Sequence, residues 1–489
     1  MKVKSIRELA KLRKKNKNFK IGLCHGVFDI IHDGHIDHFK YAKNKVDILI
    51  VSITSEKFVN KGPRQPLNND NQRINVLNSV KFIDYVFLNK KKDSQEVLNN
   101  LKPDYYFKGK DYLSNDAHGN LKKEIRILKK NQGKVIFTKT KLKSSTKLFN
   151  NNYNWTSEQK EYLSKVSNYS FVNLKDMFNK ISRETVNIIG EPIIDKYEYC
   201  DIVGTTTKDP AISVLSKKTI SIGGGVIAAA KMASKFCKKV NLITYGKTKI
   251  LKSFLKNYKN INLINVSNKQ NIQCKIRFIN SNREEKLIQV TNFKKNFFSQ
   301  KDINNCLKQL KKIKNKNLII CDFGLGLFQD KILNYLNSNY KNNYLNVQTN
   351  SINLGFNLFT KYKKYKYLSL DTREWALGLK KSDFNLNQID KIIKSYKYLA
   401  ITKGKEGSIF KTKKQTIESP VFVKTAKDTT GSGDAFFIIT SIMIMINADT
   451  KLIPFIGNIY AGMHAQNLGN YTIVDKNDLL INTNSLIKY

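Results

Sequence analysis

Two histidines, His32 and His35, lie three positions apart at the end of an apolar run that reads GVFDIIHDGH. Gly34 lets the backbone turn closely before a helix that we predict to start near His35. The first N–H groups of such a helix favour a phosphate, and imidazole N–H groups can donate to its oxygens. We therefore predict that both imidazoles bind nucleotide phosphates while negative charge develops in the transition state. Histidines that cap a helix or bind core carbonyls would show the same spacing, so the spacing alone leaves both interpretations open.

A second chemical signal is the segment AKDTTGSGDAFF at residues 426–437. Gly431 and Gly433 allow close backbone approach, and the apolar helix that follows directs its first N–H groups at the turn. This turn can form an anion hole for a transferred γ-phosphoryl group. Asp434 at its rim is placed to take the proton of an attacking hydroxyl as a general base. A glycine-rich turn with an aspartate cap is also common as a purely structural feature.

The elements that must position the histidines alternate regularly over the first 150 residues. Apolar, strand-like runs occur at 20–28, 47–53, 85–88, 105–109 and 134–139. Helical patterns occur between them, at 35–45, 72–80, 95–101 and 122–131. Strand–helix alternation predicts a parallel sheet with helices on both faces and a ligand site at the carboxyl ends of the strands.

The pattern lapses near residues 149–159, which are polar and rich in asparagine. We predict a first domain at 1–149, a linker at 150–180 and a second α/β domain at 181–489. The second domain opens with a strand at 185–195 and continues with strands near 239–244, 317–324, 367–371 and 398–404. Segments 196–222 and 272–293, rich in Val, Ile and Thr, are predicted to form extra strands laid across the main sheet as a flap.

The charge of the chain is strongly basic, with 86 Lys and Arg against 39 Asp and Glu, a formal net charge of +47. Only nine of the basic residues are arginine, and the lysines are spread along the whole length. Specific nucleic-acid binders concentrate charge in a patch and use arginine forks. The composition therefore predicts a solvated, lysine-covered surface and no specific nucleic-acid partner, although a positive field favours encounters with phosphorylated metabolites.

The compartment is predicted from the six cysteines and the apolar runs. The cysteines show no C-x-x-C pair and no metal-ligand spacing, which favours buried free thiols in a reducing compartment. The basic N-terminal segment lacks an apolar core of signal-peptide length, and the apolar stretch 435–446 is too short to span a membrane and is predicted to be a buried helix. We expect a soluble cytoplasmic protein with no membrane partner.

The segment GVFDIIHDGHIDHFKYAK resembles the nucleotidyltransferases of the G-x-F-D-x-x-H-x-G-H type, which include cytidylyltransferases and the adenylyltransferase module of heptose biosynthesis. Further segments resemble that family in the same order: RQPLNNDNQRINVLNSVKFIDYVFL, PDYYFKGKDY and KSSTK. The resemblance implies a Rossmann-like domain in which a sugar phosphate attacks the α-phosphorus of ATP or CTP, with Mg²⁺, and pyrophosphate leaves. His32 and His35 would hold the triphosphate, and Lys43 would meet its phosphates. The other implied nucleotide or phosphate contacts are Gly26, Phe28, Asp29, Arg73, Lys110, Asp111, Ser144, Ser145 and Thr146.

The segment at 426–437 resembles the D-T-x-G-A-G-D motif of ribokinase-like sugar kinases, with Ser432 for the usual alanine. The likeness extends over about residues 185–480 and implies a ribokinase-like domain that uses ATP, with Asp434 as base and Glu374 placing Mg²⁺ through water. The implied sugar contacts are Asp195, Gly223, Gly224 and Gly225. The implied ATP and anion-hole residues are Lys403, Gly404, Gly407, Thr430, Gly431, Ser432 and Gly433. Ile227 stands where the family has a sugar-binding asparagine, and Leu325 stands where lysine is common. The resemblance therefore leaves the identity of the sugar substrate open.

Together the two segments resemble the bifunctional heptose kinase/nucleotidyltransferases with the module order reversed. We expect an enzyme of nucleotide-sugar synthesis that phosphorylates a sugar or sugar phosphate and couples a sugar phosphate to a nucleotide, and the flap suggests a homodimer. One alternative is a polyol-phosphate cytidylyltransferase with a non-catalytic kinase-like half. An alternative of another class is a lysine-rich nucleic-acid-binding protein, whose binding would depend steeply on salt. Class I aminoacyl-tRNA synthetases share the H-x-G-H motif, but the sequence shows no anticodon-binding region, which disfavours that class.

Overall fold

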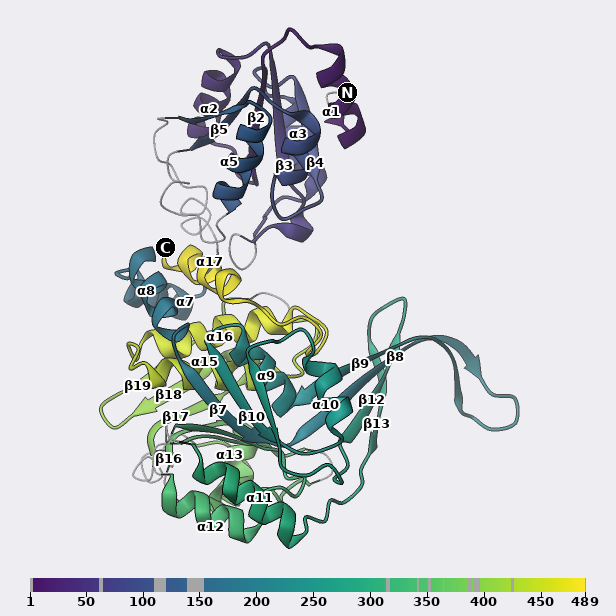
Figure 1. The fold of residues 1–489 in the computed structure, drawn as a ribbon, viewed down its shortest axis with the longest axis vertical. Helices are drawn as coiled ribbons and strands as arrows, with labels where there is room; N and C mark the ends of the chain where they lie inside the picture. The colour runs from purple at the N-terminus through teal and green to yellow at the C-terminus, as the bar shows by residue number, and fades with distance from the viewer. Residues whose placement is uncertain are drawn as a thin grey trace. The chain divides into compact units, whose positions relative to one another are not determined.

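The computed structural model describes residues 3–60, 65–109, 120–138, 154–313, 317–340, 343–350, 353–363, 365–385, 389, 396–423 and 426–488. The chain divides into two compact units, one of residues 1–174 with 477–489 and one of residues 175–476 (Figure 1). Each unit contains a largely parallel sheet with helices, which confirms the predicted α/β class. The domain boundaries predicted above, at 149 and 181, remain predictions.

The first unit contains a six-stranded parallel sheet in the order β1-β4-β3-β2-β5-β6. Its strands are β1 (Val3–Lys4), β2 (Ile21–Gly26), β3 (Ile48–Thr54), β4 (Tyr85–Asn89), β5 (Tyr105–Gly109) and β6 (Lys134–Thr138). After β2 the chain adds β3 and β4 on one side and then β5 and β6 on the other side. The strand order therefore reverses between β2 and β5, and the carboxyl ends of these two strands are the expected ligand position.

Helices cover both faces of this sheet because successive strand residues point to opposite faces. On β2, Leu23 packs into one apolar cluster with Leu9 and Leu101, whereas Cys24 packs into another with Phe39. The helices are α1 (Ile6–Lys15), α2 (Asp33–Lys43), α3 (Asp70–Asn78), α4 (Gln95–Leu101) and α5 (Asn120–Lys130), with a 3-10 turn η1 (Glu56–Phe58). The stretch predicted as a linker contains α7 (Ser157–Val166) and α8 (Phe171–Ile181), and α17 (Lys476–Ile487) lies near the C-terminus.

The second unit is built on a nine-stranded sheet in the order β11-β10-β7-β14-β15-β16-β17-β18-β19. Its strands are β7 (Thr185–Gly190), β10 (Lys239–Thr244), β11 (Ile261–Asn265), β14 (Leu318–Asp322), β15 (Tyr344–Val347), β16 (Tyr365–Asp371), β17 (Tyr396–Thr402), β18 (Ser408–Thr412) and β19 (Thr416–Ser419). The first seven strands in this order run parallel, and β18 and β19 are antiparallel. The carboxyl ends of β7, β14, β15, β16 and β17 therefore meet at one edge.

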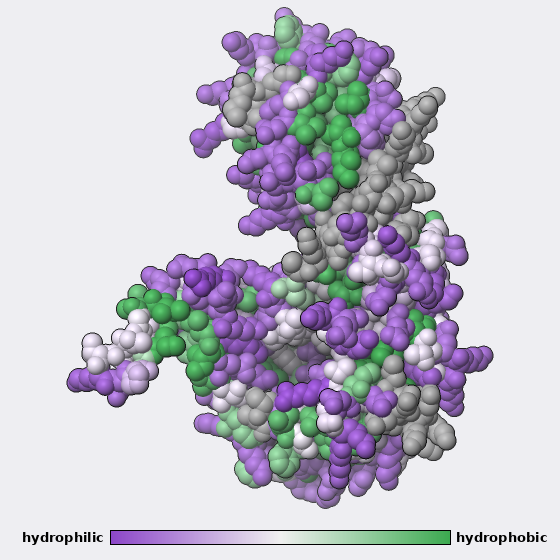
Figure 2. All heavy atoms as spheres, turned by 180° about the vertical axis from the view of Figure 1, so that it is seen from behind, coloured by the Kyte–Doolittle hydropathy of each residue, from purple (hydrophilic) through white to green (hydrophobic). Residues whose placement is uncertain are grey.

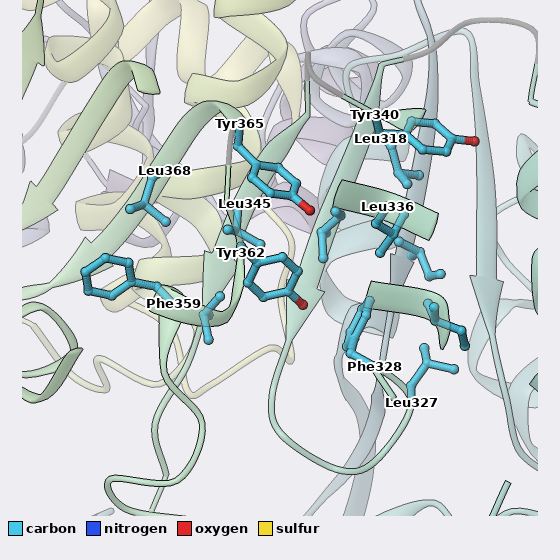
Figure 3. Packing of buried hydrophobic residues seen from close by; sticks show 14 of the residues in the cluster. Leu318, Leu327, Phe328, Leu336, Tyr340, Leu345, Phe359, Tyr362, Tyr365 and Leu368 are labelled. Atoms are coloured by element: carbon cyan, nitrogen blue, oxygen red, sulfur yellow. The ribbon is translucent and has the colours of Figure 1, made fainter. Parts of the chain in front are cut away.

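The core of this unit lies between the sheet and its helices. Leu318, Leu345 and Leu368 on neighbouring strands belong to one buried cluster with Leu336 of α12 (Asp330–Asn339), as Figure 3 shows. On the other face, α15 is buried along nearly its whole length, which confirms the predicted buried helix at 435–446. The helices are α9 (Val226–Ser234), α10 (Thr248–Leu255), α11 (Gln300–Lys311), α12 (Asp330–Asn339), α13 (Thr372–Gly378), α15 (Ser432–Met445) and α16 (Leu452–Ala465), with 3-10 turns η3 (Phe359–Lys361) and η5 (Gly404–Glu406).

A separate four-stranded sheet in the order β13-β12-β8-β9 forms the flap sheet. Its strands are β8 (Pro192–Thr205), β9 (Ile212–Gly225), β12 (Gln273–Asn280) and β13 (Lys286–Asn292). The long β8–β9 hairpin projects from the unit (Figure 1). The predicted extra strands in 196–222 and 272–293 are thus confirmed.

Two predictions about the chain as a whole concern its cysteines and its longest apolar helix. All six cysteines are free thiols, and five of them are buried. Among the described helices, none combines the length and the apolar character needed to cross a bilayer.

Candidate active sites

The H-x-G-H segment follows β2 at the sheet edge where the strand order reverses. His32 is the N-cap residue of α2, in extended conformation, and His35 lies in the first turn. The two imidazole rings stack with centroids 3.9 Å apart. In this structure the N–H of Gly34 donates to Asp33 Oδ1 and the N–H of His35 donates to the His32 carbonyl, both at 2.9 Å, so phosphate binding by both rings at this helix start remains a prediction.

Phe28 packs against His35 and supports its imidazole ring. Its ring lies edge-on to that of His35, with centroids 5.4 Å apart, and the Phe28 backbone adopts a left-handed φ of 47°. This conformation is rare for a bulky residue and is found where the surroundings enforce it. A Cβ at Gly26 would lie 3.0 Å from the Phe28 ring, so a side chain there would push the ring from its place. Gly26 and Phe28 therefore support the His35 imidazole.

Asp29 and Arg73 hydrogen-bond to backbone groups of the segments around the site. The Asp29 carboxylate accepts hydrogen bonds from the backbone N–H groups of Leu67 (2.7 Å) and Asn68 (2.9 Å). The fully buried Arg73 guanidinium donates to the carbonyls of Val27 and Thr54, each at 2.8 Å, and pairs with Asp70 at 2.5 Å. Through these contacts Arg73 joins the loop after β2, the end of β3 and the first turn of α3, and its contact with a nucleotide remains a prediction.

Replacing Arg73 with methionine is expected to lower the stability of the first unit by about 3 kcal/mol, since the carbonyls of Val27 and Thr54 lose their buried donor and the partly exposed carboxylate of Asp70 loses its cation. Amide exchange in peptides from β2 and β3, followed against urea, separates this unit from the other. Lys43→Met, which breaks a half-exposed pair, is the control and should cost about 1 kcal/mol or less. Equal midpoints for the two variants would contradict the role of Arg73.

Lys43 does not join the histidines, and the expectation that it meets the phosphates is wrong for this structure. Eight helical positions separate it from His35, a rise of about 12 Å. Its ammonium bonds the carboxylate of Asp84 and the carbonyl of Asp47, both at 2.7 Å. Asp47 and Asp84 immediately precede β3 and β4, so Lys43 lies at the opposite, amino-terminal end of the sheet.

A buried polar cluster beside the site was missed by the sequence reasoning. The Lys108 ammonium on β5 pairs with the Glu124 carboxylate at 3.5 Å, and Glu124 also accepts from Ser94 Oγ at 2.7 Å. His25 on β2 contacts Ser52 through Nδ1 at 3.1 Å, and burial lowers its pKa to about 4, so its ring is neutral. Lys108 is the lysine of the K-G-x-D-Y element, and this element is the sequence signal that could have identified it. The predicted contacts Lys110, Asp111, Ser144, Ser145 and Thr146 lie outside the described residues.

The predicted anion hole lies at the N-terminus of α15. Gly431 is the N-cap residue, with a left-handed φ of 81° that favours glycine. Space is open at Gly433, where a Cβ would meet no atom within 4 Å. The first N–H groups of a helix have no partner in a preceding turn, so this open end can bind an anion. The structure thus brings Thr430, Gly431, Ser432 and Gly433 together in one turn.

Asp434 lies in the first turn of α15 with 7% of its surface exposed. Its Oδ1 accepts a hydrogen bond of 2.5 Å from the amide of Gln348, which follows β15. Burial raises the pKa of Asp434 to about 7, although the Gln348 hydrogen bond opposes this shift. A carboxylate with this pKa is suited to accept a proton near neutral pH.

The predicted sugar-binding residues lie on the flap sheet. Asp195 on β8 pairs with the buried guanidinium of Arg277 on β12 at 2.6 Å. Gly224 on β9 leaves room for this carboxylate, since a Cβ there would collide with Asp195 Oδ2. Ile227 is fully buried in α9 and offers no polar contact to a sugar. Arg277 was not predicted, and it neutralises the charge that Asp195 would bring to the acceptor. Gly223 and Gly225 flank Gly224 on the strand.

Lys403 follows β17 at the same edge of the main sheet. Its ammonium lies 3.7 Å from the Glu418 carboxylate, and the turn behind it contains Gly404 and Gly407, with left-handed φ values of 57° and 91°. These glycines let the chain reverse into β18. The role of Lys403 in binding ATP remains a prediction.

Glu374, predicted to place Mg²⁺ through water, lies in the first turn of α13, and that role remains a prediction. Its two oxygens accept hydrogen bonds from the backbone N–H groups of Asp371 (2.8 Å) and Thr349 (3.2 Å), so it caps α13. Burial raises its pKa to about 8, with the neighbouring Asp371 charge adding to the effect. In the described parts of the chain, no three His, Cys, Asp or Glu side chains converge on a metal position.

Glu191, directly after β7, is another residue that the sequence reasoning missed. Its buried carboxylate accepts backbone N–H groups from Phe323, Leu325 and Leu327 at 2.8–2.9 Å. It therefore fixes the loop after β14, which contains the leucine that replaces the family lysine. Burial and the charge of Asp322 raise the pKa of Glu191 to about 7.

Two family models match the chain over adjacent segments. The model described as Cytidylyltransferase-like matches residues 23–178, and the model of the pfkB family carbohydrate kinases matches residues 186–437. The H-x-G-H segment lies in the first match, and the turn before α15 lies in the second.

Curated relatives match only part of the chain. The Bifunctional protein HldE of Campylobacter concisus (strain 13826) is 32% identical over 136 residues, which cover 27% of this chain and 29% of that protein. The protein of the same name from Campylobacter jejuni subsp. jejuni serotype O:2 is 41% identical over 113 residues, covering 23% of this chain and 24% of that one. The chain thus spans less than a third of the length of these relatives.

Among solved structures, a mutant of phosphofructokinase-2 from Escherichia coli has a TM-score of 0.51 and 14% identity, covering 62% of this chain and 99% of that one. The same enzyme in complex with fructose-6-phosphate has a TM-score of 0.50 and 12% identity, covering 60% of this chain and 96% of that one. At this identity the likeness shows the fold of the second unit, which confirms the ribokinase-like prediction.

Proposed function

The chain belongs to the pfkB family of carbohydrate kinases, and from this premise we propose a bifunctional enzyme of nucleotide-sugar synthesis. Its second unit phosphorylates a sugar or sugar phosphate of the heptose type with ATP, and its first unit transfers a nucleotidyl group to a sugar phosphate. The observation that carries the kinase half is the position of Asp434, a buried carboxylate with a pKa near 7 at the open N-terminus of α15.

In the proposed kinase step, the acceptor hydroxyl gives its proton to Asp434 while its oxygen bonds the γ-phosphorus of ATP. The bond between the γ-phosphorus and the bridging oxygen breaks, and ADP leaves. The N–H groups at the start of α15 would stabilise the charge on the γ-phosphoryl oxygens. Gln348 holds the carboxylate in place, and Asp195 with its partner Arg277 would face the acceptor.

In the proposed transferase step, a phosphate oxygen of the sugar phosphate attacks the α-phosphorus of the nucleotide and pyrophosphate leaves. No covalent bond to the protein is needed, so catalysis rests on positioning and charge stabilisation. The stacked His32 and His35 rings and the first N–H groups of α2 supply donors at one point. The reversal of strand order between β2 and β5 puts this point where ligands bind in such sheets.

ATP is the proposed kinase donor, and ATP or CTP the proposed nucleotidyl donor. Mg²⁺ is proposed as the ion that travels with these nucleotides. Since the described residues form no cage of carboxylates, the phosphate oxygens and water would provide most of its ligands. Bound there, the ion would neutralise phosphate charge.

Incubation of the full chain with Mg²⁺, ATP or CTP and a panel of sugars and sugar phosphates tests both halves. We expect pyrophosphate with one nucleotide and one class of sugar phosphate, and ADP with one class of acceptor. Pyrophosphate release without any ADP would favour the alternative, a polyol-phosphate cytidylyltransferase whose kinase-like half is non-catalytic. Neither product, together with salt-dependent retention on DNA, would favour the nucleic-acid-binding alternative.

The pH profile of phosphorylation is expected to follow Asp434. Below a pH of about 7, kcat/KM should fall about tenfold per pH unit, because the base accepts a proton only when it is ionised, and above it the rate should level off. ATP affinity measured over the same range separates this effect from loss of binding. A rate that stays flat through pH 7 would contradict the assignment.

We further propose a cytoplasmic homodimer. Large apolar side chains gather, exposed, on the flap sheet, in the apolar patch on the projecting arm in Figure 2. Contiguous exposed apolar surface marks interaction sites. Because we expect the homodimer to form through the flap, we propose that a second copy of this chain covers the patch. The exposed residues are Ile202, Val203, Ile212, Leu215, Leu287, Ile288, Val290 and Phe293.

A further inference from the structure

Two ion pairs join the β12–β13 hairpin of the flap sheet to the dipeptide that begins the turn before α15. The Lys286 ammonium lies 2.6 Å from Asp428 Oδ1. Beside it, Lys427 pairs with Glu284 of the same hairpin. The two pairs have opposite polarity, so a shift of the hairpin by one position would set like charges against each other. The hairpin is thereby held at one position along this segment.

Asp428 connects three parts of the second unit. Its carboxylate is 1% exposed, and Oδ1 accepts a hydrogen bond from the backbone N–H of Thr430 at 2.9 Å in addition to the Lys286 contact. Oδ2 accepts from the N–H of Gly469 at 3.0 Å. A buried carboxylate with these partners needs a cation to offset its loss of hydration, and Lys286 is the cation in contact with it.

Lys286 also acts directly on the turn. Its ammonium donates to Thr430 Oγ1 at 2.9 Å, and the carbonyl of Thr430 contacts His464 Nε2 at 3.2 Å. Thr430 is followed by Gly431, the N-cap residue of α15, and Asp434 lies three residues further on. The residue that opens the anion hole is therefore held from the flap sheet on one side and from α16 on the other.

We propose that Lys286 is a positioning residue that links the flap sheet to the anion hole, so that the turn before α15 is ordered when the flap lies in place. This inference rests on the proposed kinase function. The flap sheet also carries the Asp195–Arg277 pair, which would face the acceptor in the proposed reaction. One sheet would thus place the acceptor and fix the turn whose N–H groups stabilise the charge on the γ-phosphoryl, which favours transfer to the acceptor over transfer to water.

Kinetics of Lys286→Met test the link. The kcat for phosphorylation is expected to fall about 10- to 100-fold while the KM for the acceptor changes about twofold or less, because the interaction serves the transition state. Lys286→Arg should restore most of the rate, since arginine can reach the same carboxylate. The control is Lys217→Met, which breaks the 3.2 Å pair of another flap lysine with Asp201 away from the turn. Equal losses in Lys286→Met and Lys217→Met would overturn the proposal.

Amide hydrogen exchange tests the link without any activity. In Lys286→Met, peptides that contain the N–H groups of Thr430 and Gly469 should exchange about tenfold faster or more than in the parent chain, since the Asp428 acceptor loses its cation. Lys217→Met should leave these peptides unchanged. Unchanged exchange in Lys286→Met would overturn the link. A parent chain that phosphorylates no acceptor would overturn the kinase function instead, and the exchange result would still decide the link.

Discussion

Replacing Asp434 with asparagine is expected to lower kcat for phosphorylation by about 1,000-fold, within the range that a general base contributes. Asparagine has nearly the same shape and can still meet the Gln348 amide, which donates at 2.5 Å to this position, but it cannot take the hydroxyl proton. The KM for ATP should change little, because the N–H groups of the turn remain. ADP formation with a saturating acceptor measures the effect.

Asp330→Asn provides the matched control, since Asp330 also lies in the first turn of a helix of the second unit but is exposed. Its kcat should stay within about twofold of the parent, as expected for surface positions. Pyrophosphate release by the first unit should be unchanged in both variants. If Asp434→Asn kept more than about a tenth of the parental kcat, the carboxylate would not be the base.

Replacing His35 with alanine is expected to lower the rate of pyrophosphate release by about 100- to 1,000-fold, the effect of losing one donor to a developing negative charge. The variant also loses the stacking of His35 on His32, with centroids 3.9 Å apart, and the edge contact with Phe28. His32 would then be less well placed as well. Single-turnover release of pyrophosphate, with nucleotide binding measured separately, distinguishes a loss of rate from a loss of affinity.

Asp37→Ala is the control for this variant, because Asp37 is exposed on the same helix two positions further on. Its pyrophosphate release should match the parent within about twofold. Phosphorylation by the second unit should be unaffected by either change. Loss of pyrophosphate release in both variants to the same degree would indicate damage to α2 rather than loss of a phosphate ligand.

The sequence by itself determined the local features of both sites. Strand and helix periods depend on side chains a few positions apart, and so do the turns at Gly34 and Gly431. The neighbouring rings of His32 and His35, and the placement of Asp434 in the first turn of α15, follow from spacing along one element. The flap strands were predictable for the same reason, since their β-branched residues form continuous runs.

Only the tertiary structure decided which partner each charged side chain takes. Lys43 was predicted at the phosphates, but it pairs with Asp84, 41 positions away, because its place on α2 brings it to the amino-terminal edge of the sheet. Arg73 donates to the backbone carbonyls of Val27 and Thr54, and Glu374 accepts hydrogen bonds from two backbone N–H groups.

The contact between Lys286 and Asp428 joins residues 142 positions apart, and no local pattern marks Lys286 as the partner of the first aspartate of the motif. A chain with 86 basic and 39 acidic residues offers many alternative pairs for each charge, and their energies at the surface differ little. Burial decides among them, because a carboxylate that loses its water must gain a cation or N–H donors at the place to which the fold brings it. That place depends on strand order and sheet packing, which the sequence pattern alone leaves unspecified.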